Sequence, residues 1–240
     1  MGKKGGSKHL KRFPAPKYWP IHRKTAIYTV KASPGPHSLE NCIPLLILVR
    51  EVFNLGETAK ECKTIISEGN IKVDGKIRKN YKFPIGLMDV VEIPLINKIY
   101  RILPVRKKGL IPFPITKEEK DFKLCEIKNK NLINNGQIQL NLHDGRNIIA
   151  SNSDAKYKTR DVLKISIPEQ EILEHLPMKE GVSILVTAGK HIGAYGILKR
   201  IEQRFGPHAS IVALEHEGET FQTALEYAFV IEDNIVKILS

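Results

Sequence analysis

The sequence predicts a multidomain α+β protein, and three observations support this fold class. A short capped helix leads into a tight hairpin, a long run of turn-separated strands without helical periodicity follows, and the first 39 residues contain no Asp or Glu. We therefore expect four parts along the chain. These are a basic N-terminal arm and linker (1–40), a small helix-plus-hairpin domain (41–94), a central β-rich domain (95–175) and a C-terminal β-barrel (176–240).

The composition indicates an acidic polymer as the partner. The chain has 240 residues, of which 42% are hydrophobic, so it can bury a sizeable core, and its formal net charge is +12. Three isolated cysteines, Cys42, Cys62 and Cys125, favour a reducing compartment over a disulfide frame or a zinc site. No apolar run reaches the length of a membrane span. We expect a cytoplasmic protein without a cofactor, a metal ion, a membrane or a small-molecule substrate.

Residues 1–31 are predicted to form an extended arm when free, because glycines and prolines break any periodicity and no acid balances the Lys and Arg residues. Interleaved aromatic residues could stack on bases or dock on the protein's own body. We favour an arm that folds onto RNA over a disordered solubilising tail. Its candidate RNA-binding residues are Lys3, Lys4, Lys8, Lys11, Arg12, Lys17, Trp19, Arg23 and Lys24.

Two helices are expected in the second part. The first should begin near Asn41, with Pro44 in its first turn. The second should begin after Thr58, because Thr58 and Glu61 have the spacing of a capping box. Gly69 is a natural stop just beyond its last turn.

A hairpin follows the second helix, because Asp74-Gly75 between two short strands is the strongest short-range hairpin signal. Ile71 and Val73 should face the core, so Lys72 should point the other way. A further apolar strand is expected at Met88–Ile93. The candidate RNA-binding residues around these helices and this hairpin are Arg50, Lys60, Lys63, Lys72, Lys76, Arg78 and Lys79.

The central part reads as a small β-barrel or sandwich. Strands are expected at 97–105, 122–127, 137–142, 147–150 and 162–167, while Pro112 and Pro114 should interrupt the chain. Asp144 reads as the turn-former of a hairpin, and Lys117, Lys120 and Lys123 read as exposed lysines. The candidate RNA-binding residues here are Arg106, Lys107, Lys108 and Arg146.

The C-terminal part is expected to begin with a strand at Gly181–Val186. Gly189, Gly193 and Gly196, set among apolar residues, resemble a KOW motif, which implies an SH3-like β-barrel. A short helix is expected between Phe221 and Tyr227. Residues 176–240 are slightly acidic, so we expect them to contact fewer phosphates and to face basic neighbouring proteins.

The helix and hairpin resemble the S-four RNA-binding domain, on the residues Ala59, Ile65-Ile66, Gly69, Ile71, Val73–Lys76 and Met88–Val90. Nearly the whole chain resembles small-subunit ribosomal proteins of the archaeal and eukaryotic S-four-e family, on Gly2–Arg12, Val73–Arg78, Pro84–Val90, Gln139–Asn147 and the KOW segment. The resemblance implies a ribosome-bound structural protein. Its expected partners are small-subunit rRNA and neighbouring ribosomal proteins, and its expected role is to support subunit assembly and translation.

Two alternatives remain open at this stage. One is an RNA-modifying enzyme that uses an S-four domain for delivery, and the other is a KOW-bearing transcription elongation factor. No catalytic constellation supports an enzyme: Gly189-Lys190 lacks the spacing of a phosphate loop, and His208 and His216 lack a third metal ligand. The Asp144–Arg146 turn lacks the catalytic aspartate of pseudouridine synthases. We therefore predict a non-enzymatic protein.

Overall fold

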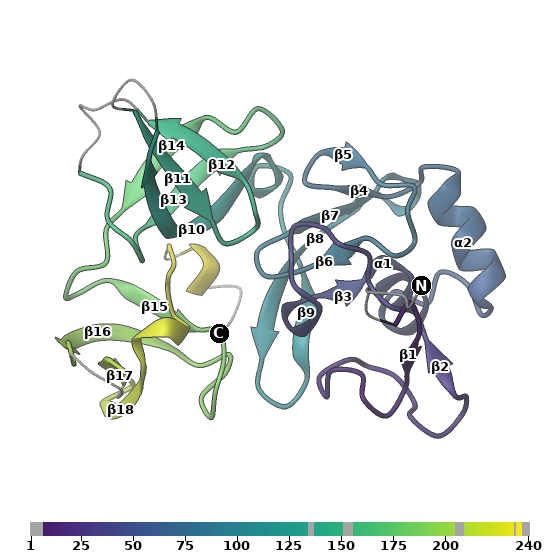
Figure 1. Cartoon of the computed structure of the whole chain (residues 1–240), viewed down its shortest axis with the longest axis horizontal. Coiled ribbons are helices and arrows are strands. Elements are labelled where there is room, and N and C mark those ends of the chain that lie inside the picture. The colour runs from purple at the N-terminus through teal and green to yellow at the C-terminus, as the bar shows by residue number, and fades with distance from the viewer. Residues whose placement is uncertain (1–6, 134–136, 151–155, 205–208, 233, 237–240) are drawn as a thin grey trace, which may run out of the picture.

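The computed structural model describes residues 7–133, 137–150, 156–204, 209–232 and 234–236. β-strands dominate this part of the chain and the helices are short, in agreement with a β-rich α+β fold. Figure 1 shows one strand-rich body beside the helices near the N-terminus, and two further sheets stacked on the other side of the molecule. Within the described residues no helix is long and apolar enough to cross a membrane.

The first large sheet is antiparallel, and its five strands lie in the order β5-β4-β7-β8-β9. The strands are β4 (Lys72–Val73), β5 (Lys76–Ile77), β7 (Val90–Ile93), β8 (Lys98–Val105) and β9 (Gly109–Pro114). The predicted hairpin is confirmed. Asp74 and Gly75 have φ of 49° and 71°, as a type I′ turn requires. Lys72 pairs with Ile77, while Ile71 and Val73 are buried.

This sheet continues past residue 94, where we expected a boundary between domains. Only a 3-10 turn, η3 (Pro94–Ile96), separates β7 from β8, and these two strands pair directly. The prediction that Pro112 and Pro114 interrupt the chain is wrong, since both lie within β9. A strand at the edge of a sheet tolerates proline because it has no neighbour on one side to receive an N–H.

The first helix begins at Leu45 and not near Asn41. Pro44 has an extended backbone and belongs to β3 (Ile43–Pro44), which pairs with β6 (Pro84–Ile85). A proline disfavours helical backbone in the residue before it, which explains why the helix cannot start earlier. The chain runs from the 3-10 turn η1 (Leu39–Asn41) through β3 into α1 (Leu45–Ile47), which continues as the π-helical η2 (Leu48–Val52).

The second helix, α2 (Ala59–Ser67), has the predicted capping box. The Glu61 N–H donates to Thr58 Oγ1 at 3.2 Å, and the Thr58 N–H donates back to Glu61 Oε2 at 3.4 Å. Cys62 and Ile66 are buried against α1 and η2. The opposite face, which carries Lys60 and Lys63, is exposed to solvent. The capping box fixes where α2 begins, and its apolar stripe fixes which face is buried. Together they leave Lys60 and Lys63 exposed to solvent.

The N-terminal segment is folded against this body, so the extended arm is wrong for residues 7–31. β1 (Leu10–Lys11) pairs with β2 (Tyr28–Thr29), and between them Ala15 and Trp19 are each 3% exposed. Both side chains belong to the same core as the residues of α1 and α2. The segment has no core of its own, but its few apolar residues complete the core of its neighbour.

The central sheet is also antiparallel, with the strand order β12-β11-β10-β13-β14. Its strands are β10 (Phe122–Leu132), β11 (Ile138–Leu142), β12 (Asn147–Ala150), β13 (Val162–Ser166) and β14 (Ile172–Leu176), and η4 (Glu119–Asp121) precedes them. Cys125, Leu140, Leu163 and Ile165 lie in its core. The edge strand β14 was not predicted, because its exposed Glu174 interrupts the apolar pattern.

The third sheet has the strand order β18-β17-β16-β15-β19. Its strands are β15 (Ser183–Val186), β16 (Tyr195–Glu202), β17 (Ile211–His216), β18 (Glu219–Ala224) and β19 (Ala228–Val230). The expected helix is wrong over most of its length, because Phe221 lies in β18 and only η7 (Leu225–Tyr227) is a 3-10 turn. Glu217-Gly218, both with positive φ, form the hairpin turn that makes β18 a strand.

The glycines of the KOW-like segment have two different roles. Gly189 and Gly193 have φ of 81° and 80°, the left-handed backbone that favours glycine. Gly196 lies in β16 without a positive φ, but a side chain there would come within 2.7 Å of the Glu215 carbonyl oxygen. A side chain at Gly193 would come within 2.8 Å of the Pro104 carbonyl oxygen, so the segment packs closely against the end of β8.

Candidate RNA-binding interface

The exposed cations of α2 and the β4–β5 hairpin form the most accessible positive surface of the helix-plus-hairpin region. Lys60, Lys63, Lys76 and Lys79 are exposed and Lys72 is half-buried. Among the described residues, none of these five lysines has a carboxylate within 4.0 Å. We call these residues the hairpin surface. Their charges are available to an external anion.

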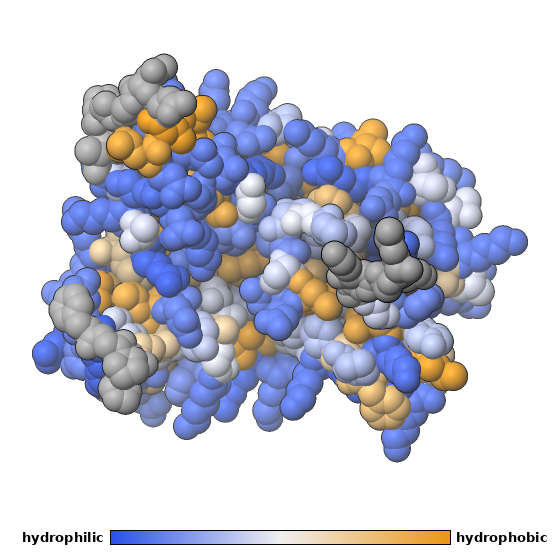
Figure 2. Space-filling view, viewed as in Figure 1, coloured by the Kyte–Doolittle hydropathy of each residue, from blue (hydrophilic) through white to orange (hydrophobic). Residues whose placement is uncertain are grey.

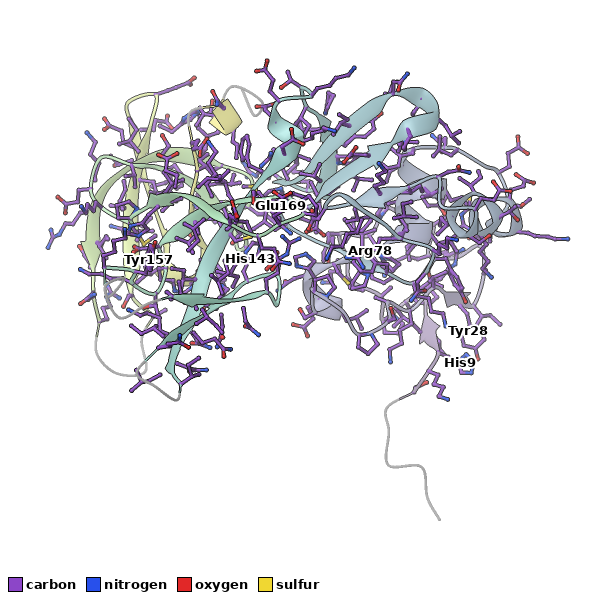
Figure 3. The ribbon with its side chains drawn as sticks, turned by 90° about the horizontal axis from the view of Figure 1, so that it is seen from above. His9, Tyr28, Arg78, His143, Tyr157 and Glu169 are labelled. Atoms are coloured by element: carbon purple, nitrogen blue, oxygen red, sulfur yellow. The ribbon has the colours of Figure 1, made fainter. Side chains whose placement is uncertain are left out.

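The two arginines of this region differ from the lysines. Arg50 pairs with Glu51 on its own helix, with Nε 3.0 Å from Glu51 Oε1, so its charge is already balanced. The Arg78 guanidinium lies over the Phe83 ring, 4.4 Å from its centroid, and the side chain is partly buried. Figure 3 places Arg78 near the middle of the molecule, at the junction with the rest of the chain.

The cations of the N-terminal segment fall into two groups. Lys8, Lys11, Lys17 and Lys24 are exposed. Arg23 instead donates to four backbone carbonyls, those of Arg12, Phe13, Ala15 and Pro16, at 2.8–3.1 Å. Arg12 donates to the carbonyls of Tyr28 and His22 and to Thr25 Oγ1. Lys3 and Lys4 lie outside the described residues. The two arginines therefore hold the fold of the segment together.

The assignment of Trp19 to RNA binding is wrong. Its ring is 3% exposed, and Nε1–H donates to the Cys42 carbonyl at 2.7 Å. A base could stack on this ring only if the segment detached from the body. Tyr18, its neighbour, is tied to the same loop, with its hydroxyl donating to the carbonyls of Glu40 and Cys42.

The basic turn Arg106–Lys108 is exposed and joins β8 to β9. Figure 1 shows this turn at the lower end of the β8–β9 hairpin, whereas β4 and β5 lie at its upper end. The structure therefore does not bring the turn into the hairpin surface. It lies beside the N-terminal segment, because a side chain at Gly109 would come within 2.4 Å of Tyr18.

A buried group of charges joins the hairpin to the central sheet, and sequence reasoning missed it. Lys123 is fully buried, and its Nζ lies 2.9 Å from Asp74 Oδ2, 2.5 Å from Asp89 Oδ1 and 3.0 Å from Asp144 Oδ2. The expectation of an exposed Lys123 is wrong, because turns from two sheets place three carboxylates around it. We call Lys123, these three aspartates, Arg146 and His37 the junction cluster.

Arg146 belongs to this cluster and is not a free surface cation. Its Nη2 lies 2.6 Å from Asp74 Oδ2, and its Nε lies 3.1 Å from Asp144 Oδ2. His37 contributes Nε2, 3.0 Å from Asp89 Oδ1. Asp144 also forms the predicted turn, since it accepts from the Arg146 N–H at 3.2 Å. The interpretation of Asp144 as a turn-former was correct but incomplete.

The carboxylates determine the protonation of the cluster. Burial alone would lower the pKa of Lys123, but the three aspartates raise it well above its ordinary value. Burial would raise the pKa of Asp144, but Lys123 and neighbouring positive groups lower it to about 2. The pKa of Asp89 is likewise lowered by His37 and Lys123, against the effect of burial. Lys123, Asp144 and Asp89 are therefore charged at neutral pH.

A signal for this cluster was present in the sequence. Lys123 lies between Phe122 and Leu124 in the mostly apolar first half of β10, residues 122–127, a position where a lysine needs a buried partner. The partners could not be found by spacing, since Asp74 lies 49 residues away and Asp89 lies 34 residues away.

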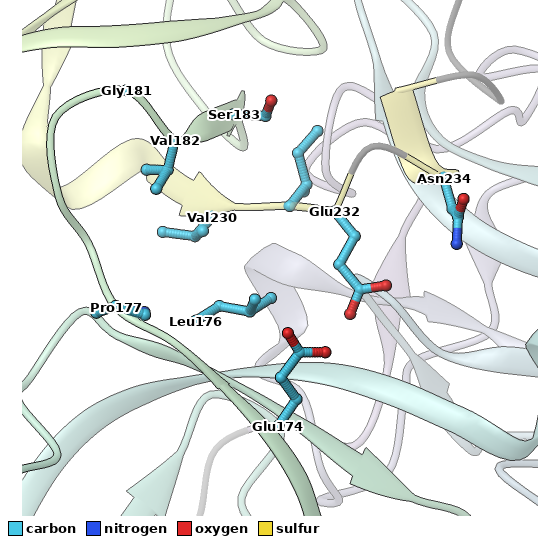
Figure 4. Close-up of a pocket in the computed structure, with 10 residues that line it drawn as sticks. Glu174, Leu176, Pro177, Gly181, Val182, Ser183, Val230, Glu232 and Asn234 are labelled. Carbon is cyan, nitrogen blue, oxygen red and sulfur yellow. The ribbon is translucent and has the colours of Figure 1, made fainter.

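A cavity of about 480 Å³ lies between β14 and the third sheet. Figure 4 shows the carboxylates of Glu174 and Glu232 facing one another across it. Lys164 balances them, with Nζ 2.9 Å from Glu232 Oε1 and 3.9 Å from Glu174 Oε2. The described residues contain no group of three or more His, Cys, Asp or Glu side chains that could hold a metal ion. Lys164 thus ties the central sheet to the segment that follows β19.

Known protein families match three stretches of the chain. Residues 4–40 match the RS4NT (NUC023) domain, residues 54–91 match the S4 domain, and residues 96–172 match the ribosomal family S4e. The N-terminal match covers the segment that folds onto the α1–α2 core. The S4 match covers α2 and the β4–β5 hairpin, which carry the hairpin surface.

Full-length relatives give the same result. The chain is 47% identical to small ribosomal subunit protein eS4 of Desulfurococcus amylolyticus, over 99% of this chain and 98% of that protein. It is 48% identical to the protein of the same name from Methanothermobacter thermautotrophicus, over 93% and 92% of the two chains. The crystal structure of 30S ribosomal protein S4e from Thermoplasma acidophilum superposes with a TM-score of 0.70 at 32% identity, over 80% of this chain and 95% of that one. The chain therefore belongs to the eS4 family of small ribosomal subunit proteins, which are structural proteins and not enzymes.

Proposed function

We propose that this protein binds the rRNA of the small ribosomal subunit through the hairpin surface of its S4 domain. The observation that carries the proposal is the set of exposed lysines on α2 and β4–β5 that have no carboxylate within 4.0 Å among the described residues. Each unpaired lysine can neutralise a phosphate and release a condensed counterion, which is the main source of affinity in such complexes. The regular backbone of a folded RNA would be recognised by its shape and not by a base code.

The exposed lysines of the N-terminal segment extend this surface in the proposal. Lys8, Lys11, Lys17 and Lys24 are held on a folded segment, so they lose less conformational entropy on binding than lysines of a free arm. The Arg106–Lys108 turn is a separate contact on the same protein, adjacent to Tyr18. We assign these cations to RNA contacts that are distinct from those of the hairpin surface.

The remaining parts of the proposal concern the domains and the neighbours. We keep the four-part division as a division of the sequence, supported by family matches at 4–40, 54–91 and 96–172, although the first sheet crosses its boundary at residue 94. We also keep the KOW-like, SH3-like barrel for residues 176–240, where five antiparallel strands support it. The slightly acidic C-terminal part would face basic ribosomal proteins, and the protein would work bound to cytoplasmic ribosomes during assembly and translation.

Charge reversal at the hairpin surface tests the proposal. Changing Lys72, Lys76 and Lys79 to Glu should abolish specific rRNA binding and reduce the slope of log K against log salt by about two units or more. The matched control changes Lys117, Lys179 and Lys190 to Glu, since all three are exposed and lie outside the S4 domain. The control alters total charge equally and should bind far better. Equal losses in both variants would show that net charge alone explains binding.

A further inference from the structure

A cavity of about 360 Å³ lies where the hairpin of the S4 domain meets the central sheet. Its walls come from the β4–β5 hairpin and its exit, the β11–β12 turn and the loop after β13, and they include Lys76, Arg78, Arg146 and Gln170. Asp74, Asp89 and Asp144 of the junction cluster form one side. We call this space the junction cavity. The junction cavity and the hairpin surface are different sites that share one residue, Lys76, at the rim of the cavity.

Two arginine N–H groups that line this region have no acceptor among the described residues. Arg146 uses Nη2 and Nε on the junction cluster, but its Nη1 is buried and unpartnered. Arg78 Nε is also buried and unpartnered, while its guanidinium is held against the Phe83 ring. Leaving a buried, charged donor without an acceptor is costly, and native proteins seldom do so. Each of these two arginines therefore has a donor that an acceptor in the cavity could use.

The carboxylates of the cavity do not meet this need, because none of their oxygens accepts from Arg78 Nε or Arg146 Nη1. They bind other donors. Asp74 accepts from the Val90 N–H and from Lys123 and Arg146. Asp89 accepts from the Gly86 N–H, as well as pairing with His37 and Lys123.

The charges around the cavity also favour an anion. Four cations oppose three carboxylates, so one positive charge remains in excess; the cations are Lys76, Arg78, Lys123 and Arg146. An anion with several oxygens that reaches both guanidinium groups would match these donors and this excess charge. A phosphate group has this chemistry, and arginine binds it through its planar set of donors.

We propose that the junction cavity seats a single phosphate of the RNA backbone, held by Arg78 and Arg146 with Lys76 at the rim. The inference rests on the proposed rRNA binding and adds a defined contact to it. Because Arg78 follows β5 and Arg146 lies before β12, one phosphate would connect the S4 hairpin to the central sheet. Bound RNA would thus fix the two parts of the protein relative to each other as well as neutralise charge.

The test uses the full-length protein, inorganic phosphate as the probe, and the variants Arg78→Gln and Lys79→Gln. Arg78 has no ion pair among the described residues, so its replacement should leave the junction cluster intact, and Lys79 is its exposed neighbour with the same charge. Melting temperatures are measured against phosphate, with chloride at equal ionic strength as the reference. Apparent phosphate affinity should fall about tenfold or more in Arg78→Gln and should barely change in Lys79→Gln. The proposed phosphate site would be wrong if phosphate did not raise the melting temperature of the parent, or if it raised the melting temperatures of all three proteins equally.

The second arm measures binding to a small-subunit rRNA fragment. Arg78→Gln should lose about tenfold in affinity, while Lys79→Gln should lose much less. Similar losses of rRNA affinity in both variants would contradict the proposed phosphate site but would be compatible with the proposed function. If the parent shows the phosphate effect but no rRNA binding, the proposed function fails and so does RNA as the source of the phosphate.

Discussion

Lys76 and Lys123 are both lysines of β-strands, but they differ in exposure and in ion pairing. Lys76 lies on the exposed hairpin surface, and no described carboxylate lies within 4.0 Å of it. Lys123 is fully buried and has three carboxylates within 3.0 Å. The hairpin surface offers its charge to a partner, whereas the junction cluster uses its charge to hold two sheets together.

The comparison shows that a count of positive residues overstates the surface available to RNA. Arg23, Arg50 and Arg146 are bound to groups of the protein itself, and Trp19 is buried. The lysines of the hairpin surface have no carboxylate within 4.0 Å among the described residues, because a flexible, strongly hydrated ammonium group gains little from a fixed partner. In this protein most arginines stabilise the fold, and the exposed lysines are the better candidates for phosphate contacts on the surface; the phosphate proposed for the junction cavity is the exception. Figure 2 shows that one face of the molecule is mostly hydrophilic with small apolar patches.

The largest expected effect is on the free energy of unfolding when each of the two lysines is replaced. Lys123→Met should lower the free energy of unfolding by about 3–5 kcal/mol, because it leaves three buried carboxylates without their shared cation. Lys76→Met should change it by about 0.5 kcal/mol or less, as is usual for an exposed residue. Urea denaturation of both variants measures the difference. Equal stability of Lys123→Met and Lys76→Met would show that the junction cluster does not hold the two sheets together.

The next prediction concerns His143, which contacts the junction cluster. Its Nδ1 accepts from the Glu126 N–H at 3.2 Å and its Nε2 lies 3.3 Å from the Leu87 carbonyl, an arrangement that requires the neutral ring. Burial, assisted by Lys123, lowers its pKa to about 3, although Asp144 opposes this. Figure 3 shows His143 in the interior, away from the ends of the molecule.

The sign of the pH effect follows from this lowered pKa. Between pH 6.5 and about 3 the unfolded chain binds a proton at His143 that the folded state does not bind. Stability should therefore fall as the pH falls, by up to about 1.4 kcal/mol per pH unit from this group. Replacing His143 with Gln should remove this part of the slope in chemical denaturation at several pH values, whereas replacing the exposed His22 should not. An unchanged slope in the His143 variant would show that the ring is not held neutral.

The smallest effect tests an arginine of the N-terminal segment. Arg23→Met should destabilise the protein by about 1–3 kcal/mol, because four carbonyls lose a charged donor. Lys24→Met, at the exposed neighbouring position, should have almost no effect on thermal melting. If rRNA affinity drops in the Arg23 variant while its melting temperature is unchanged, Arg23 belongs with the RNA-binding cations instead.

Local patterns predicted much of the fold and part of the candidate site. Thr58 and Glu61 form their capping box, and Asp74-Gly75 form their turn, because both structures depend on residues within four positions of each other. Helix α1 was misplaced because Pro44, with its extended backbone, serves strand β3 instead of a first helical turn. Strand β18 was missed because its Glu217-Gly218 turn was overlooked.

The sequence by itself determined the S4 hairpin, the exposed face of α2 and the excess of positive charge, since each depends on neighbouring residues or on composition. Only the tertiary structure decided which charges are free. Lys123 meets Asp74 across 49 residues and Arg146 meets Asp74 across 72, distances over which spacing carries no information. Burial determines which charges are paired. A charge removed from water needs a partner inside the protein, whereas an exposed charge is solvated by water and remains able to bind an external partner.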